Sequence, residues 1–386
     1  MYASPPEISC FEIETFHYLR DLVVENNIHC DWLSTTSVHG LYTENLVDRA
    51  ARNLAKLAAT YPHLAESACL VTQGPPSDPS LPTLRELGVP DARAAVVLKH
   101  AASLWPYKLV AWVLKELLAA ESEGSRSSES EQGWFNLQTG TVVTEVQRVE
   151  DSWIVHTERG QVAAENVLLA CNGYVSNLLP DFTGLIEPVQ GQVASLRSGA
   201  TRLGHTYIFL AEPPDGPVMD DYLVQAISGE KELVLGGGRV LGNAKGRGVS
   251  DDDFIDETVS HHLRTILPAV LDMHSGEDLP EGERAEMDAS FEWTGIMGYS
   301  VDGRPWVGAV PETLGGGPGL YIAAGYTGHG MPVAALSARA VVSMMGGQKK
   351  DHIPQEYVIS PERIGRVRST PRLKGELLDE MVMDQL

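Results

Sequence analysis

The sequence predicts an α/β fold in which helices and strands alternate along most of the chain. Apolar residues recur at helical spacing in residues 11–26, 44–60 and 106–120, which indicates three amphipathic helices. Residues 167–170 are wholly apolar, as is typical of a parallel strand that is buried on both faces. An apolar strand at 320–324 leads into a run of glycines and then into a helix-like stretch.

The elements between these landmarks follow from local patterns. A β-like stretch at 29–43 ends at Thr43, a suitable N-cap for the second helix. Residues 74–90 are rich in proline and glycine and predict a loop. Residues 94–104 predict a strand, and Pro106 suits the first turn of the helix that follows it.

The period of the pattern changes after a polar, low-complexity insert at 121–133. Residues 141–171 alternate between apolar and polar side chains and predict a three-stranded meander, which includes the apolar strand. The meander ends in Asn172 and Gly173. Because open α/β sheets bind ligands at the carboxyl ends of buried strands, these two residues are candidates for a binding site.

The carboxyl-terminal half continues the alternation. Further strands are predicted within 185–240, and an acidic helix is predicted at 251–272. The strand at 320–324 then enters residues 325–331, which we call the glycine turn. Such a turn between a strand and a helix lets backbone N–H groups approach an anionic or electron-rich ligand closely. Beyond Gly347 the chain is polar and contains prolines, and we assign it no function.

The 386 residues are enough for two domains, and their charge narrows the class of protein. The 52 acidic and 29 basic side chains give a net charge of −23. We therefore expect no nucleic acid and no membrane surface as partner, because both are bound largely through Lys and Arg. Residues 313–338 carry no charged side chain, but their glycines and prolines argue against a membrane-spanning helix.

The spacing of the cysteines is evidence on metal binding, and their number is evidence on the cellular compartment. They are scattered without the spacing of a metal site, at Cys10, Cys30, Cys69 and Cys171. This usage predicts reduced thiols in an intracellular, cytoplasmic protein, with no bound metal.

Three sequence blocks together resemble the FAD-dependent oxidoreductases of the D-amino-acid oxidase, glycine and sarcosine oxidase superfamily. The first is VLLACNGYVSNLLP (167–180) followed by EPVQGQVASLR (187–197). The second is WTGIMGYSVDGRPWVG (293–308), and the third is GLYIAAGYTGHGMPVAA (319–335). The order and spacing of these blocks carry the likeness, which extends weakly over most of residues 10–345.

The resemblance implies a fold in two parts: a Rossmann-like FAD-binding domain and an interleaved substrate domain with an antiparallel sheet. The implied FAD-binding domain comprises residues 1–27, 103–180 and 291–347, the substrate domain comprises 28–102 and 181–290, and residues 348–386 form a polar tail.

The same resemblance implies a unit that this sequence does not contain. Members of the family open with a strand, a GxGxxG turn, a helix and an acidic residue for the adenosine ribose, and no such run is present. The glycine clusters at 233–242 and 314–322 lack the required strand-before-helix context. We therefore expect the first βαβ unit to be missing, with the chain beginning some tens of residues into the family's fold and its FAD-binding domain incomplete.

By resemblance FAD is held without a covalent bond, since no cysteine follows Cys171, and we expect this binding to be weak or lost. The glycine turn would approach the pyrimidine edge of the flavin, where the positive end of the next helix stabilises the negative charge formed on reduction. The implied cofactor-binding residues are Val142, Val143, Asn172, Gly173, Gly325, Tyr326, Thr327, Gly328, His329, Gly330 and Met331.

Each of these assignments has a plain structural alternative. The glycine turn would then be an ordinary strand–helix connection, and Asn172 with Gly173 a tight turn. Val142 and Val143 would be core residues, and His329 would be a hydrogen-bonded support that touches no ligand.

The implied substrate-binding residues are Trp293, Met297, Tyr299, Arg239 and Tyr222. Amino-acid oxidases of the family commonly carry an Arg near the position of Met297, where it binds the substrate carboxylate bidentately. Because methionine cannot do so, we expect an amine or modified amine rather than a free α-carboxylate compound. Solvated or structural roles stay open for Arg239 and Tyr222, and no catalytic acid or base is assigned.

The sequence thus predicts a flavoprotein that oxidises a C–N bond of a small amine or amino acid by hydride transfer to flavin. Two alternatives stay open: a non-catalytic family member that binds a small molecule or partner without flavin, and a flavin-independent enzyme that reuses the pocket. The lack of GxGxxG favours the alternatives, whereas the glycine turn and residues 302–308 favour the flavoenzyme. The sequence predicts no particular oligomeric state.

Overall fold

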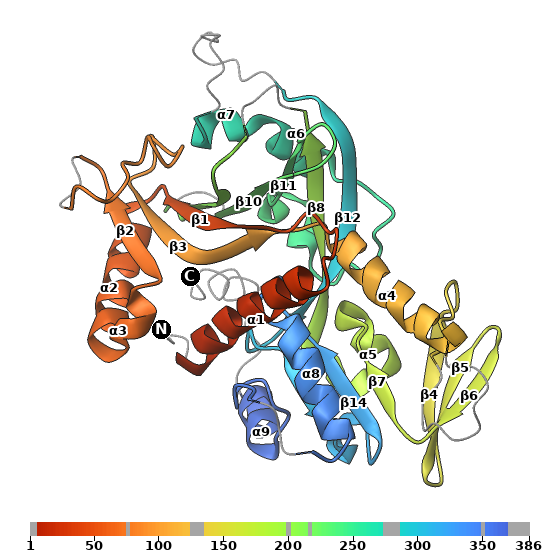
Figure 1. Ribbon diagram of the computed structural model, residues 1–386. Coiled ribbons are helices and arrows are strands. Elements are labelled where there is room, and N and C mark those ends of the chain that lie inside the picture. Colours follow the sequence, from red (N-terminus) through yellow and green to blue (C-terminus); the bar gives the residue numbers. More distant parts are fainter. Residues whose placement is uncertain are drawn as a thin grey trace.

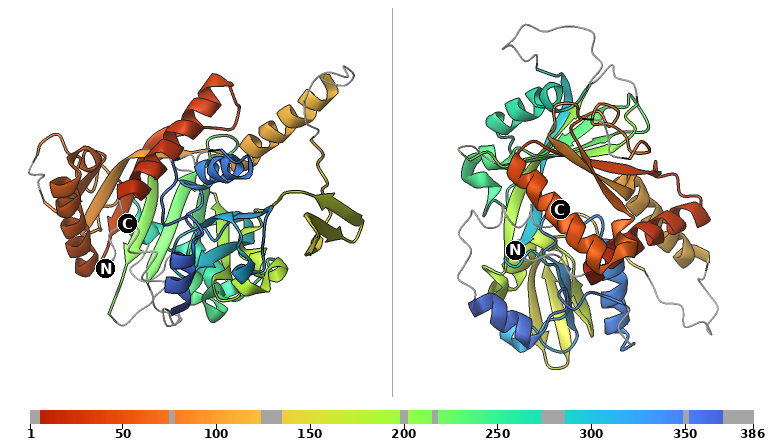
Figure 2. Two further views of the ribbon diagram at one scale, coloured as in Figure 1. Left: turned by 90° about the horizontal axis from the view of Figure 1, so that it is seen from below. Right: turned by 90° about the vertical axis from the view of Figure 1, so that its left-hand side faces the viewer.

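The computed structural model describes residues 6–74, 78–123, 135–197, 202–214, 218–272, 286–348 and 352–369. Figure 1 shows an eight-stranded sheet in its upper half and a three-stranded sheet in its lower half, with α1 (Pro6–Glu25) between them. A third sheet stands at one end of the molecule, apart from the other two, as the left view of Figure 2 shows. This arrangement confirms the predicted α/β class.

Each of the three sheets is described by the order of its hydrogen-bonded strands. The large sheet runs β12 (Ala289–Ser300), β8 (Ile186–Leu196), β11 (Leu233–Gly236), β10 (Met219–Gln225), β9 (Thr206–Ala211), β1 (Leu33–Leu41), β3 (Ala94–Ser103) and β2 (Ala68–Thr72). The small sheet runs β13 (Trp306–Ala309), β14 (Leu320–Ala324) and β7 (Val167–Leu169). The third sheet is the meander of β4 (Val143–Val149), β5 (Ser152–Thr157) and β6 (Gly160–Ala164).

Helices connect and cover these sheets. Besides α1, the described α-helices are α2 (Glu44–Thr60), α3 (Pro62–Ala65), α4 (Pro106–Glu123), α5 (Val175–Leu178), α6 (Glu257–Thr265), α7 (Leu267–Val270), α8 (Ala334–Met345) and α9 (Pro361–Ser369). The described 3₁₀ turns are η1 (Asn172–Tyr174), η2 (Pro180–Phe182), η3 (Arg239–Leu241), η4 (Asn243–Gly246) and η5 (Glu312–Leu314).

The two faces of the large sheet have different roles. Its strands pair antiparallel except for β1 and β9, which are parallel. One face encloses the main core, in which Val38, Leu223 and Leu235 pack with residues of α6 and α7. Side chains alternate between the two faces along each strand. The pairing register therefore places a second group of side chains in one continuous row on the opposite face. That row is His39, Ile208, Tyr222, Gly236, Val193 and Trp293.

We call this opposite side the turn-facing surface, because the glycine turn lies against it. On β12 the same face continues from Trp293 through Met297 to Tyr299, two residues at a time. On β8 it continues through Gly191 to Val189, which lies opposite Met297. The turn-facing surface is therefore a strip that crosses the sheet and ends under the glycine turn.

The small sheet positions the glycine turn. β14 pairs antiparallel with β13 and parallel with β7, which confirms the prediction of a parallel strand at 167–170. Trp306 and Ile322 are fully buried and pack with Phe182 in the core of this half. Among the described residues, no strand pairs with the second edge of β7.

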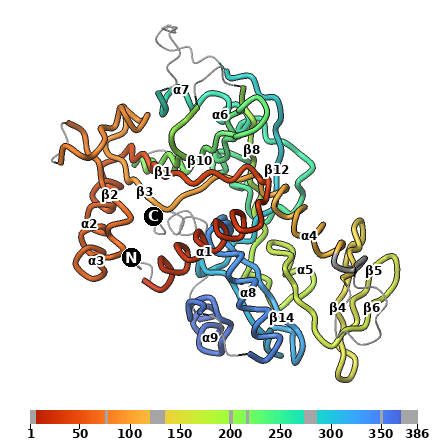
Figure 3. Tube along the Cα trace, viewed as in Figure 1, coloured from red at the N-terminus to blue at the C-terminus, as the bar shows by residue number. Residues whose placement is uncertain are grey.

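The predicted meander is correct for β4, β5 and β6, but its last strand is divided. A break at residues 165–166 separates β6 from β7, and β7 joins the small sheet instead. Figure 3 traces α4 out to this meander and the return along β7. α4 exposes apolar side chains along its length, with Tyr107 75%, Val110 55% and Leu117 42% exposed.

Two local expectations need correction. The acidic helix does not span 251–272, because α6 begins at Glu257, where the Asp256 carboxylate accepts the N–H groups of Thr258 and Val259. Thr43 precedes α2 but makes no side-chain cap, since its hydroxyl accepts the N–H of Glu212 at 3.2 Å instead. The insert predicted at 121–133 lies mostly outside the described residues.

Candidate functional site

The glycine turn is held in place by Asn172, which follows β7, the parallel neighbour of β14. The Asn172 side-chain oxygen accepts the N–H of Gly325 at 2.9 Å and that of Tyr326 at 3.3 Å. Asn172 itself has a left-handed backbone, with φ of 44°. A Cβ on Gly298 would lie 2.6 Å from that same oxygen, so β12 must approach it with a glycine. Two expected site segments, residues 172–173 and 325–331, are thus brought together.

Thr327 ties the turn to β12. Its N–H donates to the Gly298 carbonyl at 2.7 Å, and its hydroxyl accepts the N–H of Ser300 at 3.0 Å. The Ser300 hydroxyl in turn donates to Asp302 at 2.8 Å. Thr327 is 2% exposed, which makes it an anchor of the turn rather than a group that faces a ligand.

Asp302 is clamped by an arginine that sequence reasoning missed. Arg363 of α9 donates to both carboxylate oxygens of Asp302, at 2.9 and 3.0 Å, and to the carbonyls of Arg304, Pro305 and Tyr357. Its guanidinium also lies 3.9 Å from the centre of the Trp306 ring. The tail beyond Gly347, to which we assigned no function, therefore fixes the second sequence block from behind.

The second half of the glycine turn contains backbone N–H groups that are available to donate hydrogen bonds to a ligand. Within the described residues, the N–H groups of Gly328, Gly330 and Met331 donate no hydrogen bond. Gly328 has φ of +74°, and a Cβ there would lie 3.2 Å from the Tyr299 hydroxyl and 3.6 Å from the Met297 sulfur. α8 begins at Ala334, so these donors precede the positive end of a helix. The arrangement suits a negatively charged or electron-rich ligand edge.

The expected substrate residues share one surface. Trp293, Met297 and Tyr299 lie on the same face of β12, and Tyr222 lies on the same row as Trp293. The rings of Trp293 and Tyr222 are 43% and 44% exposed. Partial burial raises the pKa of the Tyr222 hydroxyl, and the neighbouring Tyr299 and Asp220 raise this pKa further.

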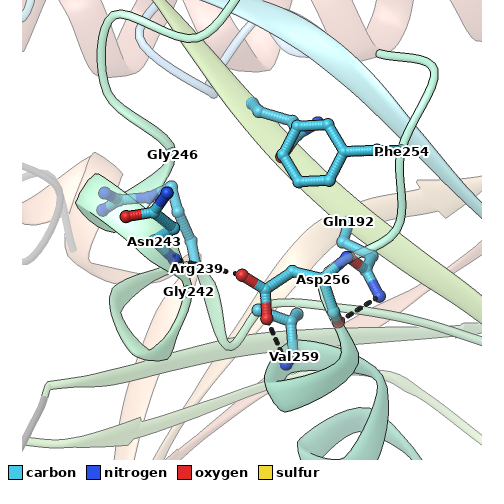
Figure 4. A pocket seen from close by; sticks show the side chains of 9 residues that line it. Gln192, Arg239, Gly242, Asn243, Gly246, Phe254, Asp256 and Val259 are labelled. Atoms are coloured by element: carbon cyan, nitrogen blue, oxygen red, sulfur yellow. Dashed lines mark hydrogen bonds between the residues drawn. The ribbon is translucent and has the colours of Figure 1, made fainter. Parts of the chain in front are cut away.

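Arg239 reaches the same surface from the edge of β8. It is 6% exposed, its guanidinium lies 5.5 Å from the centre of the Tyr299 ring, and it donates to the Lys245 carbonyl at 3.0 Å. A pocket beside it, drawn in Figure 4, is lined by Gln192, Asn243 and Asp256 among others. The geometry thus brings all five expected substrate residues to the turn-facing surface or its rim.

His329 is oriented by α1. Its Nε2 lies 3.0 Å from a carboxylate oxygen of Glu12, and its side chain is 43% exposed. A second histidine, His39 on β1, is 6% exposed on the turn-facing surface. Burial, together with the neighbouring His329, lowers the pKa of His39 to about 4. His39 is therefore neutral at neutral pH.

Three residues described above, His39, Glu12 and Arg363, were not predicted from the sequence. His39 sits in a predicted strand whose alternation could have placed it opposite Val38, on the other face. Glu12 and Arg363 had no such signal, because each meets its partner through a contact between distant parts of the chain.

Two of the expected cofactor-binding residues, Val142 and Val143, lie away from the glycine turn. Val143 begins β4, and Val142 just before it is 70% exposed. Both belong to the meander, which Figure 2 shows standing away from the glycine turn. Their assignment to the cofactor stays a prediction, as do the domain boundaries.

Comparisons with known proteins identify the family of this chain. The model of the FAD dependent oxidoreductase family matches residues 1–344. This chain therefore belongs to the FAD dependent oxidoreductase family.

Sequence relatives agree with this assignment. A probable oxidoreductase OrdL of Rhizobium meliloti is 24% identical over 220 residues, 56% of this chain and 44% of that protein. The gamma-glutamylputrescine oxidoreductase of Escherichia coli is 24% identical over 211 residues, 54% of this chain and 42% of that protein. The chain thus spans about half the length of the sequence relatives it matches.

Solved structures share the fold. Glycine oxidase from Geobacillus kaustophilus superimposes with a TM-score of 0.67 at 17% identity, covering 94% of this chain and 85% of that one. Amadoriase I from Aspergillus fumigatus gives a TM-score of 0.64 at 13% identity, covering 95% and 78%. Both likenesses confirm the predicted combination of a mixed sheet and an antiparallel substrate sheet.

The family binds FAD, and the residues of this chain fit one end of that cofactor. The three unused N–H groups of the glycine turn suit the oxygen-bearing edge of a flavin ring. A Cβ on Gly295 would meet nothing within 4 Å, so the turn-facing surface has room above β12. The sequence contains no GxGxxG, and among the described residues no strand pairs with the second edge of β7. That the first βαβ unit is missing stays a prediction.

The described residues offer neither a membrane span nor a cluster of metal-binding side chains. No helix there is long and apolar enough to cross a membrane. No three or more His, Cys, Asp and Glu side chains there are grouped to hold a metal ion.

Proposed function

We propose that this chain is a flavin-dependent oxidoreductase that oxidises the C–N bond of a small amine or amino acid. The observation that carries the proposal is the glycine turn, in which Gly328 lies beside Met297 and Tyr299 and several N–H groups donate no hydrogen bond among the described residues. FAD, when bound, supplies the two-electron oxidant that takes hydride from the carbon next to nitrogen. The substrate also loses a proton from nitrogen and becomes an imine, which water hydrolyses.

The chain's own groups then have defined tasks. The N–H groups of Gly328, Gly330 and Met331 would hold the electron-rich edge of a bound flavin and would stabilise negative charge there, because the turn fixes them in advance. The exposed rings of Trp293 and Tyr222 flank the substrate and exclude water from it. Asn172 and Thr327 hold the turn at its working distance from β12.

A second candidate is a family member that binds a small molecule without flavin. The open edge of β7 and the exposed apolar side chains of α4 favour it, because a dinucleotide would need a phosphate-binding turn beside that strand. A flavin titration separates the two candidates.

The visible absorption spectrum of the purified chain is the first test, before and after addition of FAD and removal of the excess. We expect a retained flavin spectrum that small amines bleach in the absence of oxygen. A folded chain that stays colourless and leaves FAD fluorescence unchanged would contradict the flavoenzyme and favour the second candidate.

A further inference from the structure

A pocket beside Arg239 has no task in the proposed function. It has a volume of about 290 Å³ and lies between the loop that follows β11 and the segment that leads into α6. Gln190 and Gln192 of β8 contribute to its lining. Because side chains alternate along a strand, these two face away from Gly191, which belongs to the turn-facing surface. The pocket therefore lies on the other face of β8 from the glycine turn.

Two side chains in this pocket have hydrogen-bonding groups that no other described residue uses. The Gln190 amide donates to the Asp251 carbonyl at 2.9 Å, but its Oε1 atom accepts no hydrogen bond in the described part of the chain. Asn243 donates its backbone N–H to Asp256 at 3.1 Å, whereas its side-chain amide forms no hydrogen bond there. Gln190 is 8% exposed, so its oxygen is costly to leave without a donor. The pocket thus offers a ligand one buried acceptor and one amide that both donates and accepts.

Phe254 supplies an apolar face to the same pocket. Its side chain is 42% exposed on the short segment before α6. Figure 4 shows Phe254 and Asn243 on opposite sides of the pocket. An exposed ring beside hydrogen-bonding amides suits a flat ligand, because the ring stacks on the face of the ligand while the amides bind its edge.

The two charges that line the pocket cancel and are already bound within the fold. The Arg239 guanidinium donates to the Lys245 carbonyl at 3.0 Å. The Asp256 carboxylate accepts three backbone N–H groups, from Asn243 and from the first turn of α6. A charged ligand would have to leave water for a site with no net charge, which is unfavourable. A neutral ligand avoids this cost.

The loop that forms one wall of the pocket has a strained backbone. Ala244 and Lys245 follow Asn243 directly, and both have left-handed φ values, 49° and 52°. Residues other than glycine adopt this conformation at a cost, and such strain is concentrated at functional sites. The strain therefore supports a binding role for this wall of the pocket.

We propose that this pocket binds a neutral, planar carboxamide. The plane of the ligand stacks on Phe254, its N–H donates to Gln190 Oε1, and its carbonyl accepts from the side-chain amide of Asn243. The site lies outside the proposed reaction. It needs no flavin, so its success or failure leaves the proposed function untouched.

Benzamide is the probe, and benzoate and benzylamine are charged counterparts of similar size. Their binding to the purified chain without flavin is measured by ligand-observed NMR. We expect benzamide to bind with a Kd of about 1 mM, and about fivefold more tightly than either charged compound. Asn243→Ala and Phe254→Ala should each weaken benzamide binding about fivefold. The Asn243 side chain is exposed and bonds to no described residue, so its variant should fold like the wild type.

Phe291→Ala is the matched control. Phe291 is 70% exposed on β12, outside the pocket, so the same substitution there should leave benzamide binding unchanged. The site is overturned if the wild type binds no benzamide, or binds a charged counterpart equally well. Unchanged affinity in either pocket variant overturns it too. An equal loss of affinity in Phe291→Ala and Phe254→Ala has the same meaning, because benzamide would then bind elsewhere.

Discussion

Asn172 and Gly325 are 153 residues apart in the sequence and are joined by a 2.9 Å hydrogen bond from the Gly325 N–H to the Asn172 side-chain oxygen. The same oxygen accepts the N–H of Tyr326, so a single amide fixes the start of the glycine turn. The position of the turn therefore depends on the end of β7, in another part of the chain.

We predict that Asn172→Gly lowers the free energy of unfolding by about 1–3 kcal/mol, because two backbone donors lose their acceptor. Glycine keeps the left-handed backbone, so the loss reports the acceptor and not the conformation. Urea denaturation measures it. Asn172→Asp is the control, since it keeps an oxygen in place. Equal stability of the glycine variant and the wild type would show that the hydrogen bonds to Asn172 do not stabilise the fold.

Arg363→Gln should destabilise the chain by about 3–5 kcal/mol, because it leaves Asp302 without its main partner in a largely buried position. Arg366→Gln on the same helix is the matched control. The Arg366 side chain is 61% exposed and lies 3.9 Å from Asp302, so its loss should change stability by less than about 1 kcal/mol. If the two variants lowered the melting temperature by similar amounts, Arg363 would not be the main stabilising partner of Asp302.

The pKa of His39 predicts a pH dependence of stability. The folded pKa of about 4 lies below the ordinary value of 6.5, so the unfolded chain binds more protons between these limits. Stability due to His39 is therefore full above pH 6.5 and falls as the pH drops toward 4, by about 3 kcal/mol in all.

Urea denaturation at pH 7.5 and pH 5 tests this dependence by comparing the wild type with His39→Gln. The variant should lose less stability on acidification than the wild type. His63→Gln, at an exposed position on α3, should behave like the wild type. An identical slope for the His39 variant and the wild type would contradict the neutral, buried state.

Gly328→Ala should weaken flavin binding, and Gly315→Ala supplies the comparison. The two glycines have nearly equal φ, +74° and +75°, and an added Cβ would meet a side-chain oxygen at 3.2 and 3.3 Å respectively. Both variants should lose about 1–2 kcal/mol of stability from backbone strain. Only the Gly328 variant should reduce FAD retention, measured by the visible spectrum, and equal retention by both would remove Gly328 from the cofactor site.

Much of the fold was predictable because its signals are local. α1, α2 and α4 show helical periodicity, and the strand that enters the glycine turn is apolar and bounded by glycines. The turn itself was predicted from its glycines together with the apolar strand before it and the helix-like stretch after it.

The remaining features depend on contacts that no local pattern records. Arg363 is recognisable only once α9 packs behind Asp302. The division of β6 from β7 likewise depends on which sheet accepts each strand, a choice made by tertiary pairing.

The parallel pairing of β1 with β9 has a consequence for how the chain is made. Residues 37–41 of β1 cannot pair with β9 until residues 206–210 have left the ribosome. Until then β1 has only β3 beside it, and its other edge stays available to neighbouring chains. Because such distant pairings close slowly, we expect the unprotected edge of β1 to be exposed to aggregation for much of the synthesis of the chain.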